Sequence, residues 1–228
     1  MHLQRGERAT SRTARSCAVP TLVLAAALLV VSSPRPAAGR PDLFDQLFKQ
    51  GQASNAAMKT LTASFVETTT STLLTKPLTA RGTLAVQRPS RIALRYTDPD
   101  QRVVLIDGDT MTTSWPSQSV RQSKDIGAAQ KRIQKYFVDS SPDELRSHFT
   151  IAARAADDRA GTYLITMVPK RKQIQEGLSR LELWVDGTTQ LMTAMKMTFP
   201  NGDTKVMTFT DVKPNAPLDL SRFSAGAP

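Results

Sequence analysis

The fold of this chain is most clearly indicated by one stretch, RIALRYTDPDQRVVLIDGDTMTTSW, residues 91–115. Its first part alternates with a period of two, which is typical of a strand with one buried and one exposed face. Ile92, Leu94 and Tyr96 fall on one face, and the opposite face carries two arginines. We therefore expect a strand from Arg91 to Thr97, buried on the side of Tyr96 and exposed on the other.

A hairpin turn is expected within the same stretch. Asp107-Gly108 separates residues 102–106 from residues 110–115, and an Asp-Gly pair favours a two-residue type I′ turn. The same pattern recurs at Asp186-Gly187 and at Asn201-Gly202. With further strands expected at 63–70, 78–87 and around 163–167, the sequence predicts about nine antiparallel strands joined in chain order, a large meander rather than βαβ units.

Helical signals lie before and within this series of strands. Asp42 can cap a helix whose apolar stripe is Leu43, Phe44, Leu47 and Phe48. Residues 124–149 interrupt the strands, with Ile126, Ile133 and Phe137 on one helical face and a capping box in Ser141-Pro142-Asp143-Glu144. The expected fold class is mainly β with helices (α+β), in which the helices cover one face of the sheet.

The first 39 residues predict a secretory signal peptide. Four arginines precede an apolar run from Val19 to Val31, and Ala37-Ala38-Gly39 offers small residues for cleavage. The run is shorter than the roughly 20 residues of a spanning helix. Residues 40–228 are then expected to form a single exported domain without a membrane anchor.

Charge and composition narrow the function classes. Residues 40–228 hold 25 basic and 19 acidic residues, a net charge of +6, but the basic residues are scattered and export makes a nucleic-acid partner improbable. This part of the chain has no Cys and only His148, so we expect no metal site and no cofactor. A carboxylate-dependent hydrolase stays open as an alternative, but the close acidic pairs sit beside turn and cap residues, so we do not expect an enzyme.

Methionines are unusually common in the predicted strands. Six of the seven in residues 40–228 fall there, namely Met111, Met167, Met192, Met195, Met197 and Met207. Met side chains adapt to irregular apolar surroundings. They fit either a packed core or the wall of a cavity, and composition alone does not decide between the two.

Arg88-Pro89, Pro99-Asp100 and Asp107-Gly108 form an R-P…P-D…D-G pattern. This pattern resembles that of the periplasmic outer-membrane lipoprotein carriers of the LolA family. Similar pieces lie at Ala63-Ser64-Phe65, Gly82-Thr83-Leu84, Val168-Pro169-Lys170, residues 209–215 and Phe223. The resemblance covers nearly all of residues 40–228.

The resemblance implies an incomplete, strongly curved antiparallel β-barrel with a helical lid or plug over a hydrophobic cavity. It implies a soluble, monomeric periplasmic chaperone that carries acylated lipoproteins from an inner-membrane lipoprotein-releasing transporter to an outer-membrane acceptor. Arg88 matches the family's motif arginine near the lid, which is linked to cargo transfer. The candidates for lining the cavity and binding acyl chains are Phe65, Leu84, Ile92, Leu94, Tyr96, Met195 and Met197.

The chain also departs from the family pattern. Where aromatic residues are common after Arg-Pro it has Ile92 and Leu94, and after Asp107-Gly108 it has Thr112 and Ser114 in place of Trp and Tyr. These departures predict a more aliphatic wall. A related carrier or sensor of another lipid or glycolipid is therefore kept as an alternative.

Overall fold

The computed structural model describes residues 42–133 and 140–224, which contain one antiparallel sheet of eleven strands and four α-helices. The strands are β1 (Thr60–Thr70), β2 (Leu78–Gln87), β3 (Arg91–Asp98), β4 (Arg102–Asp107), β5 (Thr110–Trp115), β6 (Val120–Asp125), β7 (Phe149–Ala155), β8 (Thr162–Pro169), β9 (Arg180–Asp186), β10 (Met192–Thr198) and β11 (Thr204–Pro214). The helices are α1 (Leu43–Ala56), α2 (Gly127–Ile133), α3 (Pro142–His148) and α4 (Lys172–Gln175), with 3₁₀ turns η1 (Pro116–Gln118) and η3 (Leu220–Phe223).

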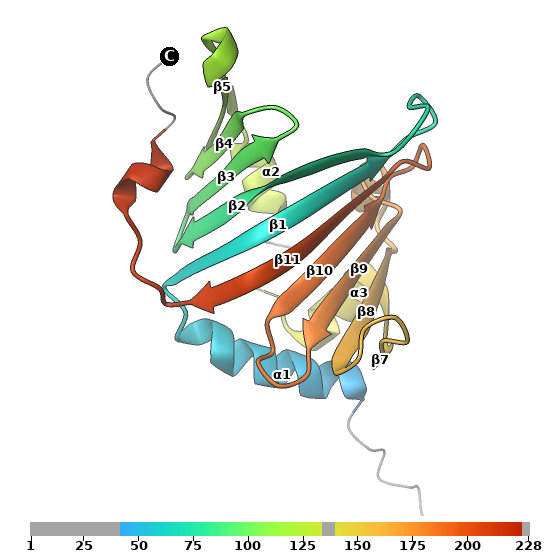
Figure 1. The fold of residues 1–228 in the computed structure, drawn as a ribbon. Helices are drawn as coiled ribbons and strands as arrows, with labels where there is room; N and C mark the ends of the chain where they lie inside the picture. The colour runs from blue at the N-terminus through green and yellow to red at the C-terminus, as the bar shows by residue number, and fades with distance from the viewer. Residues whose placement is uncertain (1–41, 134–139, 225–228) are drawn as a thin grey trace, which may run out of the picture. The chain divides into compact units, whose positions relative to one another are not determined.

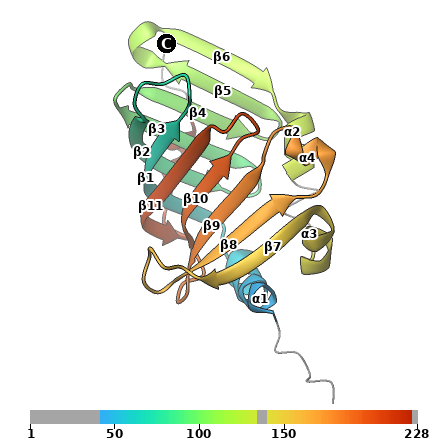
Figure 2. The same ribbon diagram turned by 90° about the vertical axis from the view of Figure 1, so that its right-hand side faces the viewer.

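The predicted meander and the open, curved barrel are confirmed. The strand order is β6-β5-β4-β3-β2-β1-β11-β10-β9-β8-β7, so chain neighbours pair everywhere except at β6 and β7, and β1 joins β11 in the middle. Within the described residues β6 and β7 are the two edges and the sheet does not close. Figures 1 and 2 show the sheet curving, with α1 crossing one end and α2 and α3 behind the sheet in the view of Figure 1.

The sequence pattern does not predict two of the strands, β6 and β7. All six residues of β6 are exposed, so no buried residue alternates with a polar one there. The segment before β7 carries strong helix signals, which led the helical prediction to extend to Phe149. Phe149 instead begins β7 and is fully buried.

Both predicted helix caps are present. The side chain of Asp42 accepts a hydrogen bond from the Phe44 N–H at 3.3 Å. Ser141 accepts from the Glu144 N–H at 3.3 Å while the Glu144 carboxylate accepts from the Ser141 N–H at 2.8 Å, which completes the capping box. Phe137 lies outside the described residues, as does the predicted signal peptide. None of the helices in the described ranges is long and apolar enough to cross a bilayer.

A core beneath α1 fixes the helices on the sheet. Phe44 and Leu47 from α1 meet Leu145 of α3, Phe149 of β7, and Ile165 and Met167 of β8. Arg146 of α3 reinforces this packing, since its guanidinium reaches Asp42 at 2.6 Å and Asp45 at 2.8 Å. These hydrogen bonds raise the pKa of Arg146, and the one to Asp42 lowers the pKa of that carboxyl.

The outer face of β3 is not exposed along its whole length, which corrects the expectation from alternation. Ala93 is only 1% exposed. Beside it, Arg95 Nη2 donates to the backbone oxygens of Ser221, Arg222 and Ser224 at 3.1, 3.0 and 2.7 Å. The C-terminal turn η3 packs against this side of β3, a contact between residues more than 120 positions apart.

The three hairpins are confirmed, but none has the expected type I′ turn. Asp107 pairs with Thr110, so the first loop is Gly108-Asp109, and Gly108 is the residue of the two with positive φ. One positive φ at the first loop position is the pattern of a type II′ turn. The other two loops span five residues each, 187–191 and 199–203, with positive φ at Gln190 and Gly202.

Candidate ligand-binding cavity

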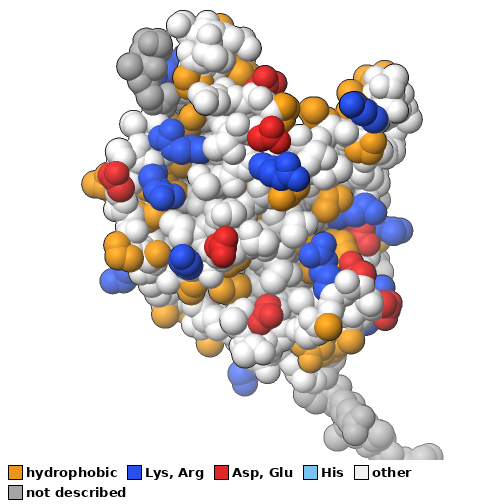
Figure 3. Space-filling view, in the orientation of Figure 1, with side chains coloured by type: hydrophobic (Ala, Val, Ile, Leu, Met, Phe, Trp, Pro, Cys, Tyr) orange, Lys and Arg blue, Asp and Glu red, His pale blue; other side chains and the backbone are white. Residues whose placement is uncertain are grey.

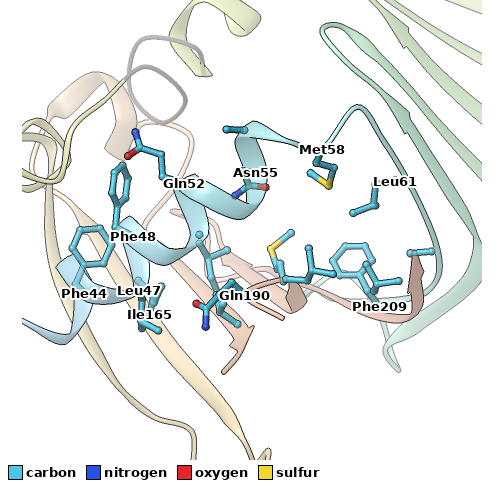
Figure 4. A pocket seen from close by; sticks show the side chains of 18 of the residues that line it. Phe44, Leu47, Phe48, Gln52, Asn55, Met58, Leu61, Ile165, Gln190 and Phe209 are labelled. Atoms are coloured by element: carbon cyan, nitrogen blue, oxygen red, sulfur yellow. The ribbon is translucent and has the colours of Figure 1, made fainter. Parts of the chain in front are cut away.

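A cavity of about 650 Å³ lies between α1 and the concave face of the sheet. Figure 4 looks into it, with Phe44, Leu47 and Asn55 on α1 and Leu61 and Phe209 on strands of the sheet. This volume is within the usual range of small-molecule pockets, roughly 300–1,000 Å³. The cavity is therefore large enough for a ligand.

One wall of the cavity comes from α1. Phe44, Leu47, Phe48 and Gly51 recur at three- and four-residue intervals, so they share the face of the helix that meets the sheet. The apolar stripe was evident in the sequence, although its role in a cavity was not. The C-terminal end of the helix is held by Asn215, which accepts from the Lys59 N–H at 2.8 Å and donates to the Ala57 carbonyl at 3.3 Å.

The other wall is built by side chains from six strands, β1, β2, β8, β9, β10 and β11. Ala63 pairs with Leu84, and Ile165 pairs with Leu183, so each pair places two apolar side chains on the same face. The remaining contributors from the strands are Leu61, Met167, Val185, Met192, Phe209 and Val212. Met192 is the one methionine of β10 that lines the cavity, and Met58 lines it from the α1–β1 linker.

Polar groups on the cavity wall are few and carry no negative charge. They are Gln52 and Asn55 on α1, Gln190 in the β9–β10 loop, and Arg88 just after β2; no Asp or Glu is among the lining residues described. The Arg88 side chain is exposed, and its backbone N–H donates to the Lys59 carbonyl at 2.9 Å. This bond holds the end of β2 beside the linker that leaves α1.

The structure brings the predicted lining residues to one face of the sheet but not all to the cavity. Strand register places all seven on the concave face, since Gly82 lies between Phe65 and Tyr96 and Leu84 lies opposite Leu94. Leu84 lines the cavity, as does Arg88. Phe65, Leu94, Tyr96 and Met195 pack instead into a second core cluster, and Ile92 and Met197 are not among the lining residues either.

A buried polar group lies within that second cluster. The Glu67 carboxylate, 6% exposed as a residue, accepts from the Tyr96 hydroxyl at 2.9 Å and from Lys205 Nζ at 3.0 Å. The Arg102 guanidinium lies 4.0 Å from the centre of the Tyr96 ring. Burial, followed by the charge of Glu67 and their hydrogen bond, raises the pKa of Tyr96 to about 12.

The raised pKa of Tyr96 predicts a loss of stability in alkali. Because the phenol ionises near pH 10 when unfolded and near pH 12 when folded, its contribution is complete below pH 10 and is lost as the pH rises to 12, by roughly 2 kcal/mol. Urea unfolding at pH 9 and at pH 11.5 measures this loss. Tyr96→Phe is expected to lack it, and an identical decline in that variant would contradict the assignment.

Several carboxylates of the close acidic pairs make structural contacts. Asp107 accepts from Arg91 Nε, Asp158 accepts from Trp184 Nε1 at 3.0 Å, and Asp143 and Glu144 occupy the first turn of α3. None of them lines the cavity. In the described part of the chain, no cluster of three or more His, Cys, Asp or Glu residues could hold a metal ion.

A family model described as "Outer membrane lipoprotein carrier protein LolA" matches residues 56–225. The chain belongs to the LolA family. The match spans every strand of the sheet, and with them the strand wall of the cavity, but it includes only the last residue of α1.

Two curated relatives support membership of the LolA family. An "Outer-membrane lipoprotein carrier protein" of Pseudoalteromonas translucida is 26% identical over 202 residues, which cover 87% of this chain and 88% of the relative. A protein of the same description from Cupriavidus taiwanensis is 26% identical over 157 residues, covering 66% of this chain and 68% of the relative. A crystal structure of MucB shares the fold, with a TM-score of 0.50 and 14% identity over 83% of this chain and 65% of MucB.

Proposed function

We propose that this protein is a periplasmic chaperone that binds the acyl chains of lipoproteins in the cavity beneath α1 and shuttles them from the inner to the outer membrane. The observation that carries the proposal is the cavity itself, about 650 Å³, lined by apolar side chains with no carboxylate among the residues described. Membership of the LolA family and the description of both curated relatives as lipoprotein carriers support it.

The physical chemistry of the cargo explains why such a cavity is needed. Exposure of an acyl chain to water costs about 0.8 kcal/mol per CH₂, so a lipoprotein does not leave a bilayer unaided. A carrier has to offer apolar surroundings of comparable quality. The aliphatic and methionine side chains on the wall provide such surroundings, and their contacts do not require one fixed orientation of the ligand.

The proposal includes the partners and the residues that would serve them. A monomeric carrier would receive cargo from an inner-membrane lipoprotein-releasing transporter and pass it to an outer-membrane acceptor, with no catalysis and no cofactor. Arg88, on the cavity wall at the α1–β1 linker, would act in cargo transfer. Leu84 would contact acyl chains directly, and the other predicted lining residues would do so only where the cavity extends past its present wall.

The decisive experiment is native mass spectrometry of the protein purified from its own envelope fraction, followed by a release assay on inner-membrane vesicles. An acylated polypeptide bound at one-to-one stoichiometry, and lipoprotein released from the vesicles, are the expected results. Bound free lipid without any lipoprotein release would replace the proposal with the alternative, a related carrier or sensor of another lipid or glycolipid. An empty protein that takes up no lipid would overturn both.

A further inference from the structure

The turn between β1 and β2, residues 71–77, exposes a group of leucines. Leu73 is 90% exposed, more than any other large hydrophobic residue described, and Leu74 and Leu78 are 41% and 53% exposed. Single exposed leucines are ordinary, but three within six residues form a local apolar surface. None of the three packs into a hydrophobic core cluster of the described residues.

The turn has a defined conformation that presents these side chains outward. The Leu73 N–H donates to the Ser71 hydroxyl at 3.2 Å, and the Leu74 N–H donates to the Ser71 carbonyl at 3.1 Å. Ser71 thus satisfies the backbone of both leucines while their side chains stay in solvent. Figure 1 shows this hairpin extending beyond the neighbouring strand ends at the upper right of the view, and Figure 3 shows hydrophobic and basic atoms there.

The charge of the turn favours an anionic surface. Residues 68–80 contain Lys76 and no Asp or Glu. Of the acidic residues on adjacent turns, Asp98 is paired with Arg81 at 3.5 Å, and Asp203 accepts from the Asn201 amide at 2.9 Å; Asp100 adds an exposed carboxylate on the β3–β4 turn. Leucines beside a lysine on a projecting tip match the lipid interface, where apolar side chains insert and cations meet phosphates.

We propose that the β1–β2 turn docks this protein on anionic lipid bilayers, with Leu73 and Leu74 inserted at the interface and Lys76 against lipid phosphates. The proposal rests on the proposed function, because a carrier of acyl chains has to meet a membrane at each end of its path. A bilayer accepts a small convex tip of this kind, since lipid tails rearrange around it.

The position of the turn separates docking from cargo binding. Leu61 and Ala63 line the cavity near the start of β1, whereas the turn follows Thr70 at the other end of the strand. Nine residues of strand span about 30 Å. A protein held at the bilayer by this turn therefore keeps its cavity away from the lipid surface and open to a protein partner.

The test is sedimentation of the purified protein with vesicles of phosphatidylcholine containing one quarter phosphatidylglycerol. Replacing both leucines, Leu73→Asp with Leu74→Asp, is expected to weaken vesicle binding by about tenfold or more, because two inserted side chains are lost. Leu220→Asp is the matched control, since Leu220 is 61% exposed on η3. Equal weakening by the control, or no weakening by the pair, would overturn the proposal, as would a wild-type protein that does not sediment with these vesicles.

A second variant tests the electrostatic part. Lys76→Ala is expected to weaken binding to the anionic vesicles by about fivefold and to leave binding to pure phosphatidylcholine unchanged. A turn that binds a protein instead would show no dependence on phosphatidylglycerol, which would contradict the proposal. Native mass spectrometry of the same variants separates the two hypotheses, because bound acyl ligand is expected in the leucine variants even when vesicle binding is lost.

Discussion

Leu84→Glu is expected to reduce the affinity of the cavity for an acyl ligand by about 100-fold or more at pH 8. Leu84 lies on the cavity wall and pairs with Ala63 on one side and Leu94 on the other. A carboxylate there would lose its hydration when the cavity fills with hydrocarbon. Equilibrium binding of a fluorescent fatty-acid analogue measures the affinity.

The control for this prediction is Thr83→Glu, one residue earlier on the same strand. Thr83 is exposed on the opposite face and pairs with Arg95, so a carboxylate there keeps water and gains a cationic neighbour. Met192→Glu provides a second cavity variant, and because Met192 is 37% exposed we expect this variant to stay folded. Partial recovery of Leu84→Glu at pH 5, where a carboxyl in apolar surroundings takes up a proton, is also expected. Unchanged affinity in both cavity variants would show that the ligand binds elsewhere.

Gly82→Ala is expected to destabilise the fold by roughly 4 kcal/mol or more and to lower Tm by about 10 °C or more. A methyl group at Gly82 would lie 2.1 Å from the Arg95 carbonyl oxygen and 2.8 Å from Cζ of Phe65. The first of these is backbone in the paired strand β3, which cannot rotate away. Thermal unfolding followed by circular dichroism measures the change.

Gly177→Ala is the matched comparison, because a Cβ at Gly177 would meet no atom within 4 Å. The same methyl group there is expected to leave Tm within a few degrees of wild type, with a small gain from reduced freedom of the unfolded chain. If the Gly82→Ala and Gly177→Ala variants had the same Tm, the close packing of Phe65 and of the Arg95 carbonyl against Gly82 would be contradicted. The two variants together therefore distinguish the steric clash of a methyl group at Gly82 from the general effect of replacing a glycine by alanine.

Strands were easier to predict than the cavity because alternation is a local signal. Ile92, Leu94 and Tyr96 predicted the boundaries of β3 to within one residue. The same alternation could not show that Ala93, on the opposite face, is buried, or that η3 contacts β3 through Arg95, since that contact joins β3 to a segment more than 120 residues away. The alternation of apolar and polar residues in a strand does not reveal whether a segment far away in the sequence covers one of its faces.

The candidate site shows the same limit. Leu84, Leu94 and Met195 are candidates for lining one cavity, and strand register places them on one face of the sheet. Which of them borders empty space depends on where α1 crosses that face. This position depends on the core around Phe44 and on the ion pairs of Arg146, which join segments about 100 residues apart. The spacing of apolar residues in α1 predicted that one face of the helix is buried. It could not distinguish a face packed against the sheet from one that lines a cavity.

Because β6 and β7 are edge strands that do not pair with each other, the volume enclosed by the curved sheet can change. A closed barrel has a circumference set by its strand number and shear, and altering it breaks hydrogen bonds between strands. In the described part of this chain no hydrogen-bond ladder joins β6 to β7. The circumference of the curved sheet is therefore not fixed by hydrogen bonds between its two edges. The sheet can relax its curvature around bulkier contents and tighten again once they leave, with every existing ladder intact.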